Sequence, residues 1–409
     1  MKALRDALFT TALFVHAWDL EDGNAATLTQ WARATGLNTL CVSATYHSGW
    51  LIQPHHASRR LRWSESGAAY FHPDERCYSG TCLRPPVAAT GAAFNHLRVA
   101  ADAARDEELR LVAWTVGAHN TRLGLAFPEL TQHNAYGDIL PHALSLGHDE
   151  SRNYLKALVR DIAANYSPYG IQLESFQWHS IRHNHAHERD LVGLSPMEQQ
   201  LLSLCFNPQT VRKAEAAGVD AEAARHAVKQ TLETAFRHAP ERPLHYPQSI
   251  EELEEVEPDL RSYRRFLRQL SESLIAEIRQ ESLSGTACRL YLQSGYSPAL
   301  RDVCDGFAVW AYGQTPEETY RTVREAVATL PDDWEGEYHC YIRLGMGVPK
   351  SPEQLREILL AARSAGATGI YLYNYSESPP AMLEWLPSPL ASLAGASPPS
   401  HARGSRETP

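Results

Sequence analysis

Short apolar runs alternate with amphipathic helical segments along almost the whole chain, and this alternation is the strongest constraint on its fold. Short apolar runs bounded by turn residues are typical of buried strands. We predict strands at residues 10–18, 38–44, 110–116, 171–176, 288–293, 307–311, 338–344 and 369–373. Strands that alternate with helices build a parallel sheet, and eight such units are typical of a (β/α)8 barrel. The sequence therefore predicts an α/β fold, a single (β/α)8 TIM barrel.

Helix-start signals lie between the predicted strands. Thr315 and Ser351 each precede a proline, and Glu318 and Gln354 follow them three residues later. A hydroxyl N-cap, a proline at the first helical position and a Glu or Gln at the third are the signature of a capping box. Gly36 is placed to end the first helix. These signals support the alternation of strands and helices.

Long connections follow the second, third and fourth predicted strands. The connection over residues 46–90 is rich in Trp, Tyr and His, and a loop of this length in a compact protein is usually functional. The fourth connection contains helical segments between residues 195 and 281. No linker composition precedes residue 390, so we predict one catalytic barrel domain over residues 1–394. Residues 395–409 are rich in Ser, Pro and Gly and are predicted to form a disordered tail.

Composition excludes several classes of partner. A net charge of -10 without a basic run argues against nucleic acid, and no segment approaches the ~20 apolar residues of a membrane span. The first 15 residues resemble a signal peptide, but Asp6 interrupts their apolar stretch and no small-residue cleavage site follows. Seven cysteines, several of them in predicted strands, favour a reducing compartment and a cytoplasmic location. Cys77 and Cys82 could alternatively form a disulfide or share a metal.

The predicted strand ends carry an unusual number of aromatic and neutral polar side chains. In a barrel of this kind the active site lies at the carboxyl ends of the strands. Aromatic faces stack on sugar rings, and neutral polar groups bind hydroxyls, so this set favours a carbohydrate ligand. The predicted substrate contacts on these strand ends and the loops that follow them are His16, Trp18, Tyr46, His47, Trp50, His119, Trp178, His179, Tyr312, Arg343 and Asn374.

Glu174, at the end of the fourth predicted strand, is the best candidate for a catalytic acid. Cleavage of a glycosidic bond needs a protonated carboxyl group for the leaving oxygen and a second carboxylate that attacks or activates water. Glu377, after the eighth strand, is the first candidate for the second group, and Asp19, after the first strand, is the next. The alternative is that Glu174 only orients Arg182 or Arg343.

A histidine-rich loop follows the fourth strand. His183, His185 and His187 alternate, so in an extended segment they would share one face, and Glu188 could complete a zinc site. The strong zinc spacings are absent, and histidines in a ligand loop also donate hydrogen bonds. We therefore predict these three histidines as substrate contacts, with no metal and no cofactor.

The chain resembles the bacterial (β/α)8 proteins grouped as glycoside hydrolases, in the clan that includes β-galactosidase-like barrels. The resemblance rests on residues 173–178 with the histidine-rich loop, on residues 201–208 leading to residues 216–220, and on residues 371–375. It implies a fourth-strand glutamate as acid/base, which corresponds to Glu174. It also implies a nucleophilic glutamate at the end of the seventh strand, where this chain has Arg343. Either the second carboxylate has moved to strand one or eight, or the barrel is not a conventional retaining hydrolase.

Three functions remain open from the sequence. The leading hypothesis is a glycoside hydrolase acting on an oligosaccharide or glycoconjugate, with Glu174 as general acid/base. The second is a metal-dependent sugar isomerase or epimerase, in which Glu174, Glu377 and histidines hold a divalent ion. The third is a non-catalytic carbohydrate-binding barrel that lacks the nucleophile. The partner in each case is a carbohydrate, and the oligomeric state is not specified.

Overall fold

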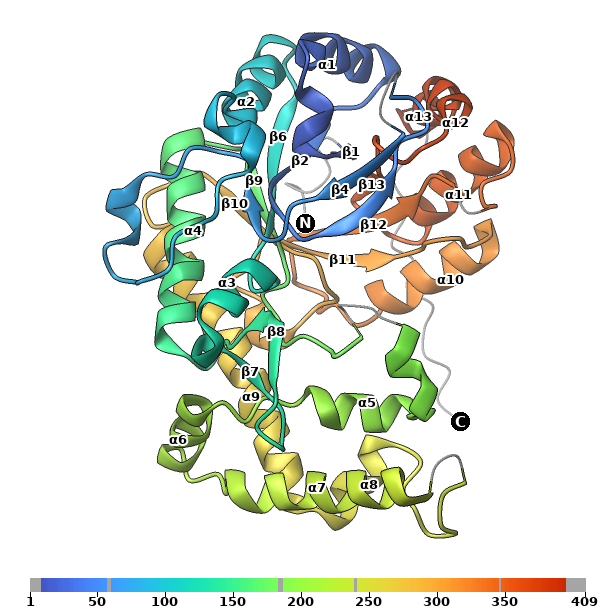
Figure 1. Cartoon of the computed structure of the whole chain (residues 1–409). Helices are drawn as coiled ribbons and strands as arrows, with labels where there is room; N and C mark the ends of the chain where they lie inside the picture. The colour runs from blue at the N-terminus through green and yellow to red at the C-terminus, as the bar shows by residue number, and fades with distance from the viewer. Residues whose placement is uncertain (1–8, 57–59, 183–186, 239–240, 346, 395–409) are drawn as a thin grey trace.

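The computed structural model describes residues 9–56, 60–182, 187–238, 241–345 and 347–394, and its centre is a closed barrel of eight parallel strands (Figure 1). The strands are β1 (Thr10–Val15), β2 (Thr39–Tyr46), β6 (Arg110–Val116), β9 (Gly170–Glu174), β10 (Arg289–Leu292), β11 (Gly306–Trp310), β12 (Glu337–Arg343) and β13 (Gly369–Tyr373). They follow one another around the barrel in chain order, and β1 closes the ring by pairing with both β2 and β13. The predicted (β/α)8 barrel, with long connections after its second, third and fourth strands, is confirmed.

Helices cover the outside of the barrel. In chain order they are α1 (Asn24–Thr35), α2 (His96–Asp106), α4 (Asp149–Tyr166), α9 (Pro258–Glu277), α10 (Pro316–Val327), α11 (Pro352–Ser364), α12 (Pro380–Trp385) and α13 (Pro387–Ala394). The main hydrophobic core fills the layer between strands and helices, and Leu13, Leu158 and Ile358 are among its buried members. Between β10 and β11 the chain makes only a short 3-10 turn, Pro298–Leu300.

The two predicted capping boxes differ in detail. At α10 the Thr315 hydroxyl accepts from the Glu318 N–H at 3.3 Å, and the Glu318 carboxylate accepts from the Thr315 N–H at 2.8 Å. At α11 the Ser351 hydroxyl accepts from the Gln354 N–H at 3.2 Å, but the Gln354 side chain accepts from the Lys350 N–H at 2.7 Å. That donor lies one residue before the N-cap, so α11 has the hydroxyl cap without the reciprocal bond of a capping box.

Aromatic side chains fill the barrel interior. Phe14 of β1 lies 5.0 Å from Trp114 of β6 and 5.4 Å from Tyr341 of β12, measured between ring centroids. Tyr291 packs over Gly170, where an added Cβ would lie 2.6 Å from the ring. Glycine at the start of β9 therefore makes room for a phenol inside the barrel. Because the interior is filled, a ligand must bind at the strand ends.

The three long connections fold into small elements. After β2 come the hairpin of β3 (Gly49–Ile52) and β4 (Leu61–Ser64), and then β5 (Ala68–Ala69). After β6 come α3 (Thr121–Ala126) and the hairpin of β7 (Thr131–His133) and β8 (Ile139–Leu144). After β9 come α5 (Pro196–Ser203), α6 (Pro208–Ala216), α7 (Ala221–His238) and α8 (Ile250–Val256). These last helices pack with α9 around a second hydrophobic core that includes Phe206, Val228 and Tyr263. This helical insertion lies below the barrel in Figure 1.

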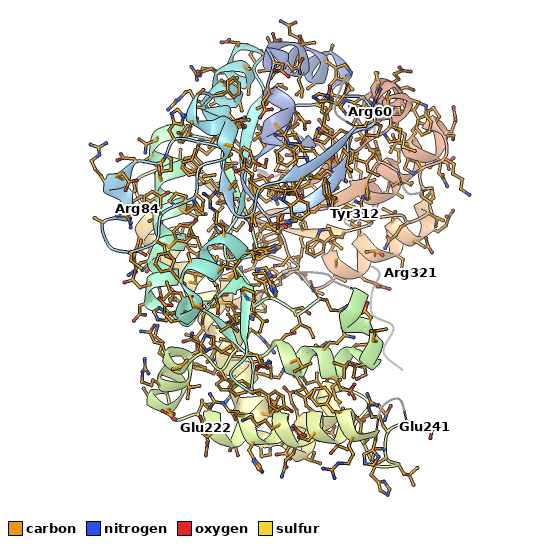
Figure 2. The ribbon with its side chains drawn as sticks, in the orientation of Figure 1. Arg60, Arg84, Glu222, Glu241, Tyr312 and Arg321 are labelled. Carbon is orange, nitrogen blue, oxygen red and sulfur yellow. The ribbon has the colours of Figure 1, made fainter. Side chains whose placement is uncertain are left out.

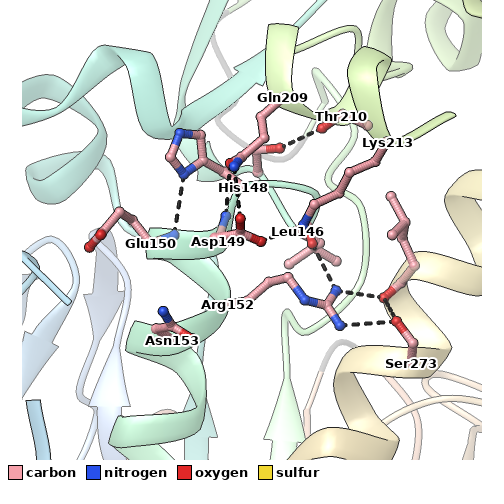
Figure 3. A network of polar contacts seen from close by, with 12 residues as sticks. Leu146, His148, Asp149, Glu150, Arg152, Asn153, Gln209, Thr210, Lys213 and Ser273 are labelled. Atoms are coloured by element: carbon pink, nitrogen blue, oxygen red, sulfur yellow. Dashed lines mark hydrogen bonds and ion pairs between the residues drawn. The ribbon is translucent and has the colours of Figure 1, made fainter. Parts of the chain in front are cut away.

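A polar network fastens the helical insertion to α4 (Figure 3). Arg152 of α4 is buried, and its guanidinium donates to the Leu270 carbonyl at 2.9 Å and to the Glu277 carboxylate at 2.5 Å. Both acceptors lie on α9. Nearer to solvent, Lys213 of α6 donates to Asp149 at the start of α4 at 2.5 Å. One buried cation and one partly exposed ion pair therefore hold the two cores together.

Some sequence predictions fall outside the described residues. Residues 1–8 and the predicted tail, residues 395–409, are among these, and the single-domain boundary stays a prediction. In the described part of the chain no helix has the length and apolar character needed to cross a membrane. All seven cysteines are free, so Cys77 and Cys82 do not form the alternative disulfide.

We predict that Arg152→Met lowers the free energy of unfolding by about 2 to 4 kcal/mol, because it leaves buried carbonyl oxygens and Glu277 without their donor. Lys213→Met is the matched control, since Lys213 and Asp149 are partly exposed and such pairs contribute at most ~1 kcal/mol. Urea unfolding followed by tryptophan fluorescence measures both variants. Equal destabilisation by the two substitutions would contradict this role for Arg152.

Candidate active site

Glu174 is the last residue of β9 and lies at the carboxyl-terminal end of the barrel, which we call the mouth. Its Oε2 accepts a hydrogen bond from Trp114 Nε1 at 2.5 Å. Trp114 itself packs on Phe14, so the carboxyl group sits against the aromatic filling of the barrel. Ser175 follows with a left-handed backbone, φ 61°, which turns the chain out of the strand. The strand therefore ends two residues earlier than predicted, at Glu174 itself.

The surroundings of Glu174 favour its protonated form. The side chain keeps partial contact with solvent but is otherwise enclosed by protein. Burial raises the pKa of the Glu174 carboxyl group to about 7, and the smaller opposing effect is the hydrogen bond from Trp114. A carboxyl group with a pKa near neutrality can hold a proton and release it to a substrate. Glu174 therefore has both the access and the acidity of a general acid.

Three phenols stand beside this carboxyl group. The hydroxyl oxygens of Tyr46 and Tyr373 are 3.5 Å apart, and their rings lie 5.0 and 6.0 Å from Trp114. Tyr312 packs 5.7 Å from Tyr373. Burial raises the pKa of all three phenols, and the nearby Glu174 carboxylate raises the pKa of each further. Glu174 is thus within electrostatic reach of tyrosines from β2, β13 and the loop after β11.

Glu377 follows β13 and is held in place by Asn374. Asn374 Nδ2 donates to Glu377 Oε2 at 2.7 Å, and Asn374 Oδ1 accepts from the Glu377 N–H at 2.8 Å. Asn374 is buried, whereas Glu377 keeps partial contact with solvent. The Glu377 charge also contributes to the raised pKa of Tyr46 and Tyr373. The structure therefore brings Glu174 and Glu377 to the same pair of tyrosines.

Asp19 lies in a 3-10 turn, Ala17–Leu20, and its carboxylate holds that turn in place. It accepts from the His16 N–H at 2.9 Å and from the Ser376 hydroxyl at 2.6 Å. Burial raises the pKa of Asp19 to about 7, against the opposing effect of the bonds from Ser376 and His16. The charge of Arg62 lowers the pKa of Asp19, and the charge of Glu21 raises it. Asp19 therefore ties the loop after β1 to the loop after β13.

His16 and Trp18 form a stacked pair at the end of β1, with ring centroids 4.4 Å apart and planes 7° from parallel. His16 Nδ1 lies 3.0 Å from the Ser376 hydroxyl, and the ring meets Tyr46 edge-on at 4.8 Å. The Arg62 guanidinium lies 4.8 Å from the Trp18 ring. Both members of the pair are buried, so protein atoms cover them and they lie beneath the mouth.

Four histidines gather at one side of the mouth, from the connections after β2, β6 and β9. His47 stacks on His119 at 4.6 Å, and the His119 ring lies 5.9 Å from His142 and 5.4 Å from His179. In the part of the chain that the structure describes, no group of three or more His, Cys, Asp or Glu side chains could hold a metal ion. Imidazole rings in such a cluster can donate hydrogen bonds to hydroxyl groups or accept them.

Arg343 ends β12, the seventh strand, where the resemblance implies a carboxylate. Its guanidinium carbon lies 5.8 Å from the ring centroid of Tyr312, which Figure 2 labels, and 5.6 Å from that of Tyr373. Its charge lowers the pKa of Tyr312, in the opposite sense to the larger effect of burial. The seventh strand thus supplies a cation to the mouth.

The remaining predicted contacts are not brought to Glu174 within the described residues. Trp50 is 65% exposed on β3 and packs against Trp63. Trp178 donates its Nε1 to the Leu267 carbonyl of α9 at 2.7 Å, so it anchors the insertion. The predicted contacts that lie outside the described part of the chain are His183, His185 and the side chain of His187.

Three residues of the mouth are missing from the set predicted by sequence: Trp114, Tyr373 and His142. Trp114 and Tyr373 lie in predicted strands, and their alternation with residues facing the helices is the signal that could have identified them. His142 lies on β8, in a segment whose sequence predicts only a connection, so no periodic signal identifies it.

The fold is similar to those of several solved glycoside hydrolases. Against α-L-fucosidase isoenzyme 2 from Paenibacillus thiaminolyticus the TM-score is 0.57 at 12% identity, with 95% of this chain and 49% of that chain covered. The chain therefore spans about half the length of that fucosidase. Against the catalytic domain of β-amylase from Paenibacillus polymyxa the TM-score is 0.55 at 11% identity, with 95% of this chain and 99% of that chain covered. Against β-galactosidase from Marinomonas ef1 the TM-score is 0.55 at 11% identity, with 94% of this chain and 59% of that chain covered.

No protein-family model and no curated protein sequence matches the chain. At identities of 11 to 12% the similarity shows the shared fold alone.

We predict that Trp114→Phe raises the pKa of Glu174 above its wild-type value of about 7. The indole N–H favours the carboxylate, so its loss favours the protonated form. A pH titration by carbon-13 NMR of protein labelled at the glutamate carboxyl carbons measures the change. Trp18→Phe is the control, because Trp18 stacks on His16 and leaves the Glu174 pKa unchanged. A lower Glu174 pKa in Trp114→Phe would contradict the assigned hydrogen bond.

Proposed function

We propose that this protein is a glycoside hydrolase that cleaves a glycosidic bond in an oligosaccharide or glycoconjugate. The observation that carries the proposal is the carboxyl group of Glu174, at a strand end in an aromatic mouth, with its pKa raised to about 7. Release of an alcohol from a sugar needs a protonated carboxyl group beside the leaving oxygen. The fold shared with solved glycoside hydrolases supports this assignment.

Glu377 is the second carboxylate of this proposal. In the described part of the chain, its carboxylate accepts a hydrogen bond only from Asn374, on Oε2, which fixes the group and leaves Oε1 for attack or for activation of water. Asp19 suits this role less, because both of its oxygens lie within hydrogen-bond distance of the Ser376 hydroxyl, at 2.6 and 2.7 Å. Asp19 instead keeps the loop that carries Glu377 beside β1.

The substrate contacts of this proposal follow from the chemistry around the two carboxylates. Tyrosine faces pack on sugar rings, and hydroxyl, imidazole and amide groups bind sugar hydroxyls. Arg343 replaces the expected strand-seven carboxylate and donates to an oxygen of the bound sugar. The contacts proposed within the described residues are Tyr46, His47, His119, His179, Tyr312 and Arg343, and Asn374 holds Glu377 in position.

A second candidate is a carbohydrate-binding barrel without catalysis. The observation that favours it is Arg343 at the strand-seven position, since a barrel that has lost its nucleophile there would bind sugar without cleaving it. Binding of sugars by calorimetry, together with no reducing-sugar release from any substrate tested, would support this candidate over the hydrolase.

We predict that Glu174→Gln lowers kcat/KM by about 10² to 10⁴-fold on oligosaccharides, the range expected for the loss of general acid catalysis. The kcat/KM for dinitrophenyl glycosides should fall much less, because their leaving group departs without a proton. Reducing-sugar and chromogenic assays over a panel of glycosides measure both. Glu233→Gln, on α7 in the insertion, is the matched control and keeps wild-type rates. Wild-type turnover of oligosaccharides by Glu174→Gln would exclude the acid role.

We also predict that Glu174→Gln changes how stability depends on pH. The folded pKa of about 7 lies above the ordinary value of 4.5, so the folded state binds this proton more tightly. The contribution of Glu174 to stability therefore falls as pH rises from 4.5 to about 7, and the glutamine variant lacks this loss. At about pH 8 the variant should be more stable by about 3 kcal/mol, and at about pH 4 it should gain nothing. Denaturant titrations at both pH values test this, and a destabilised variant at the higher pH would contradict it.

A further inference from the structure

The β3–β4 hairpin carries an apolar face that the described part of the chain leaves exposed. Trp50, Ile52, Leu61 and Trp63 are 65%, 64%, 55% and 53% exposed. The strand register pairs Trp50 with Trp63 and Ile52 with Leu61, so all four side chains lie on one side of the hairpin. The two tryptophan rings meet at 5.0 Å and 64°. We call these four side chains the hairpin face.

The opposite side of the hairpin is buried and fixed to the barrel. Leu51 is 4% exposed, and Arg62 lies 4.8 Å from the Trp18 ring and 3.5 Å from Glu21. Beyond β3, His55 Nε2 lies 2.7 Å from the Tyr375 carbonyl, in the loop after β13. The hairpin therefore runs from β2 to the loop after β13, and Figure 1 shows β4 lying across the barrel beside β13. Because Leu51 and Arg62 face the barrel, the hairpin face points away from Trp18.

The size of the hairpin face suits an interface. With roughly 250 Å² for a fully exposed tryptophan and roughly 200 Å² for leucine or isoleucine, the four exposed fractions give about 500 Å² of apolar surface. Contiguous exposed patches of this size on a monomer are often functional. Two such faces together bury about 1,000 Å², the lower limit for a specific protein interface.

The chemistry of the face suits a protein better than a sugar. A sugar subsite needs polar groups aimed at hydroxyls beside an aromatic plane. Here the two indole rings lie 64° apart and share their face with two aliphatic side chains. Aromatic and aliphatic side chains without charge are instead the composition of an interface core.

We propose that the hairpin face is the interface of a homodimer, in which a second copy of the chain docks its own hairpin face about a two-fold axis. The face consists of an aromatic row, Trp50 with Trp63, and an aliphatic row, Ile52 with Leu61. A two-fold axis that lies in the interface, parallel to the rows and between them, places the aromatic row of each copy on the aliphatic row of the other. Indole rings then meet aliphatic side chains. The same patch is thus complementary to itself, and this assignment is independent of the proposed reaction.

Sedimentation velocity of the full chain at about 100 µM tests the proposal, because an interface near this size limit assembles at high concentration. The wild-type protein should sediment at twice its monomer mass of 45.6 kDa and dissociate on dilution. Each copy carries a net charge of -10, so added salt should strengthen the dimer by screening repulsion. A wild-type monomer at this concentration in high salt would overturn the proposal.

Ile52→Asp should sediment as a monomer under the same conditions, because it places a charge in the interface core. Leu244→Asp is the matched control at a site that is 92% exposed and away from the hairpin, and it should remain a dimer. Circular dichroism melting checks that both variants fold, and Leu61→Ser replaces Ile52→Asp if that variant does not. Dimerisation of the hairpin variant at wild-type strength would overturn the proposal.

Discussion

The carboxyl group of Glu174 is buried against the indole of Trp114, and the chemistry of the mouth depends on this contact. The barrel interior beneath it is aromatic, so the indole N–H is the hydrogen-bond donor that the described residues offer the carboxylate. A single donor does not replace the water lost on burial, and the pKa of Glu174 therefore rises. The same residues that fill the barrel also raise the pKa of this carboxyl group.

Closure of the barrel surrounds that contact with aromatic side chains from more distant strands. Trp114 and Glu174 come from neighbouring strands, β6 and β9, whereas Phe14 and Tyr373 come from β1 and β13, which close the ring. Asp19 and Ser376 tie the loops after β1 and β13 together, so the segment that carries Glu377 is held beside the first strand. The helical insertion contributes a second core, and Arg152 fastens it to α4.

The sequence predicts the positions of all eight strands, because apolar periodicity and helix caps are local signals. The placement of Glu174 at a strand end follows from the same signals. Trp114 is not predicted as part of the site, because its role depends on which way an interior side chain reaches across to the next strand. Trp50 shows the converse: its type suggests a sugar contact, but the register of its hairpin places it on the outer face. His142 depends on a hairpin that no periodic pattern reveals.

We propose that the acidity of Glu174 sets the reactivity of the mouth. The most direct measurement is a carbon-13 NMR titration of the Glu174 carboxyl group in the wild-type protein, compared with the pH dependence of kcat/KM for an oligosaccharide. We predict that the carboxyl group titrates near 7 and that kcat/KM falls with the same midpoint as the pH rises. Titration near the ordinary value of 4.5, or a midpoint of kcat/KM that does not follow the titration, would contradict the account.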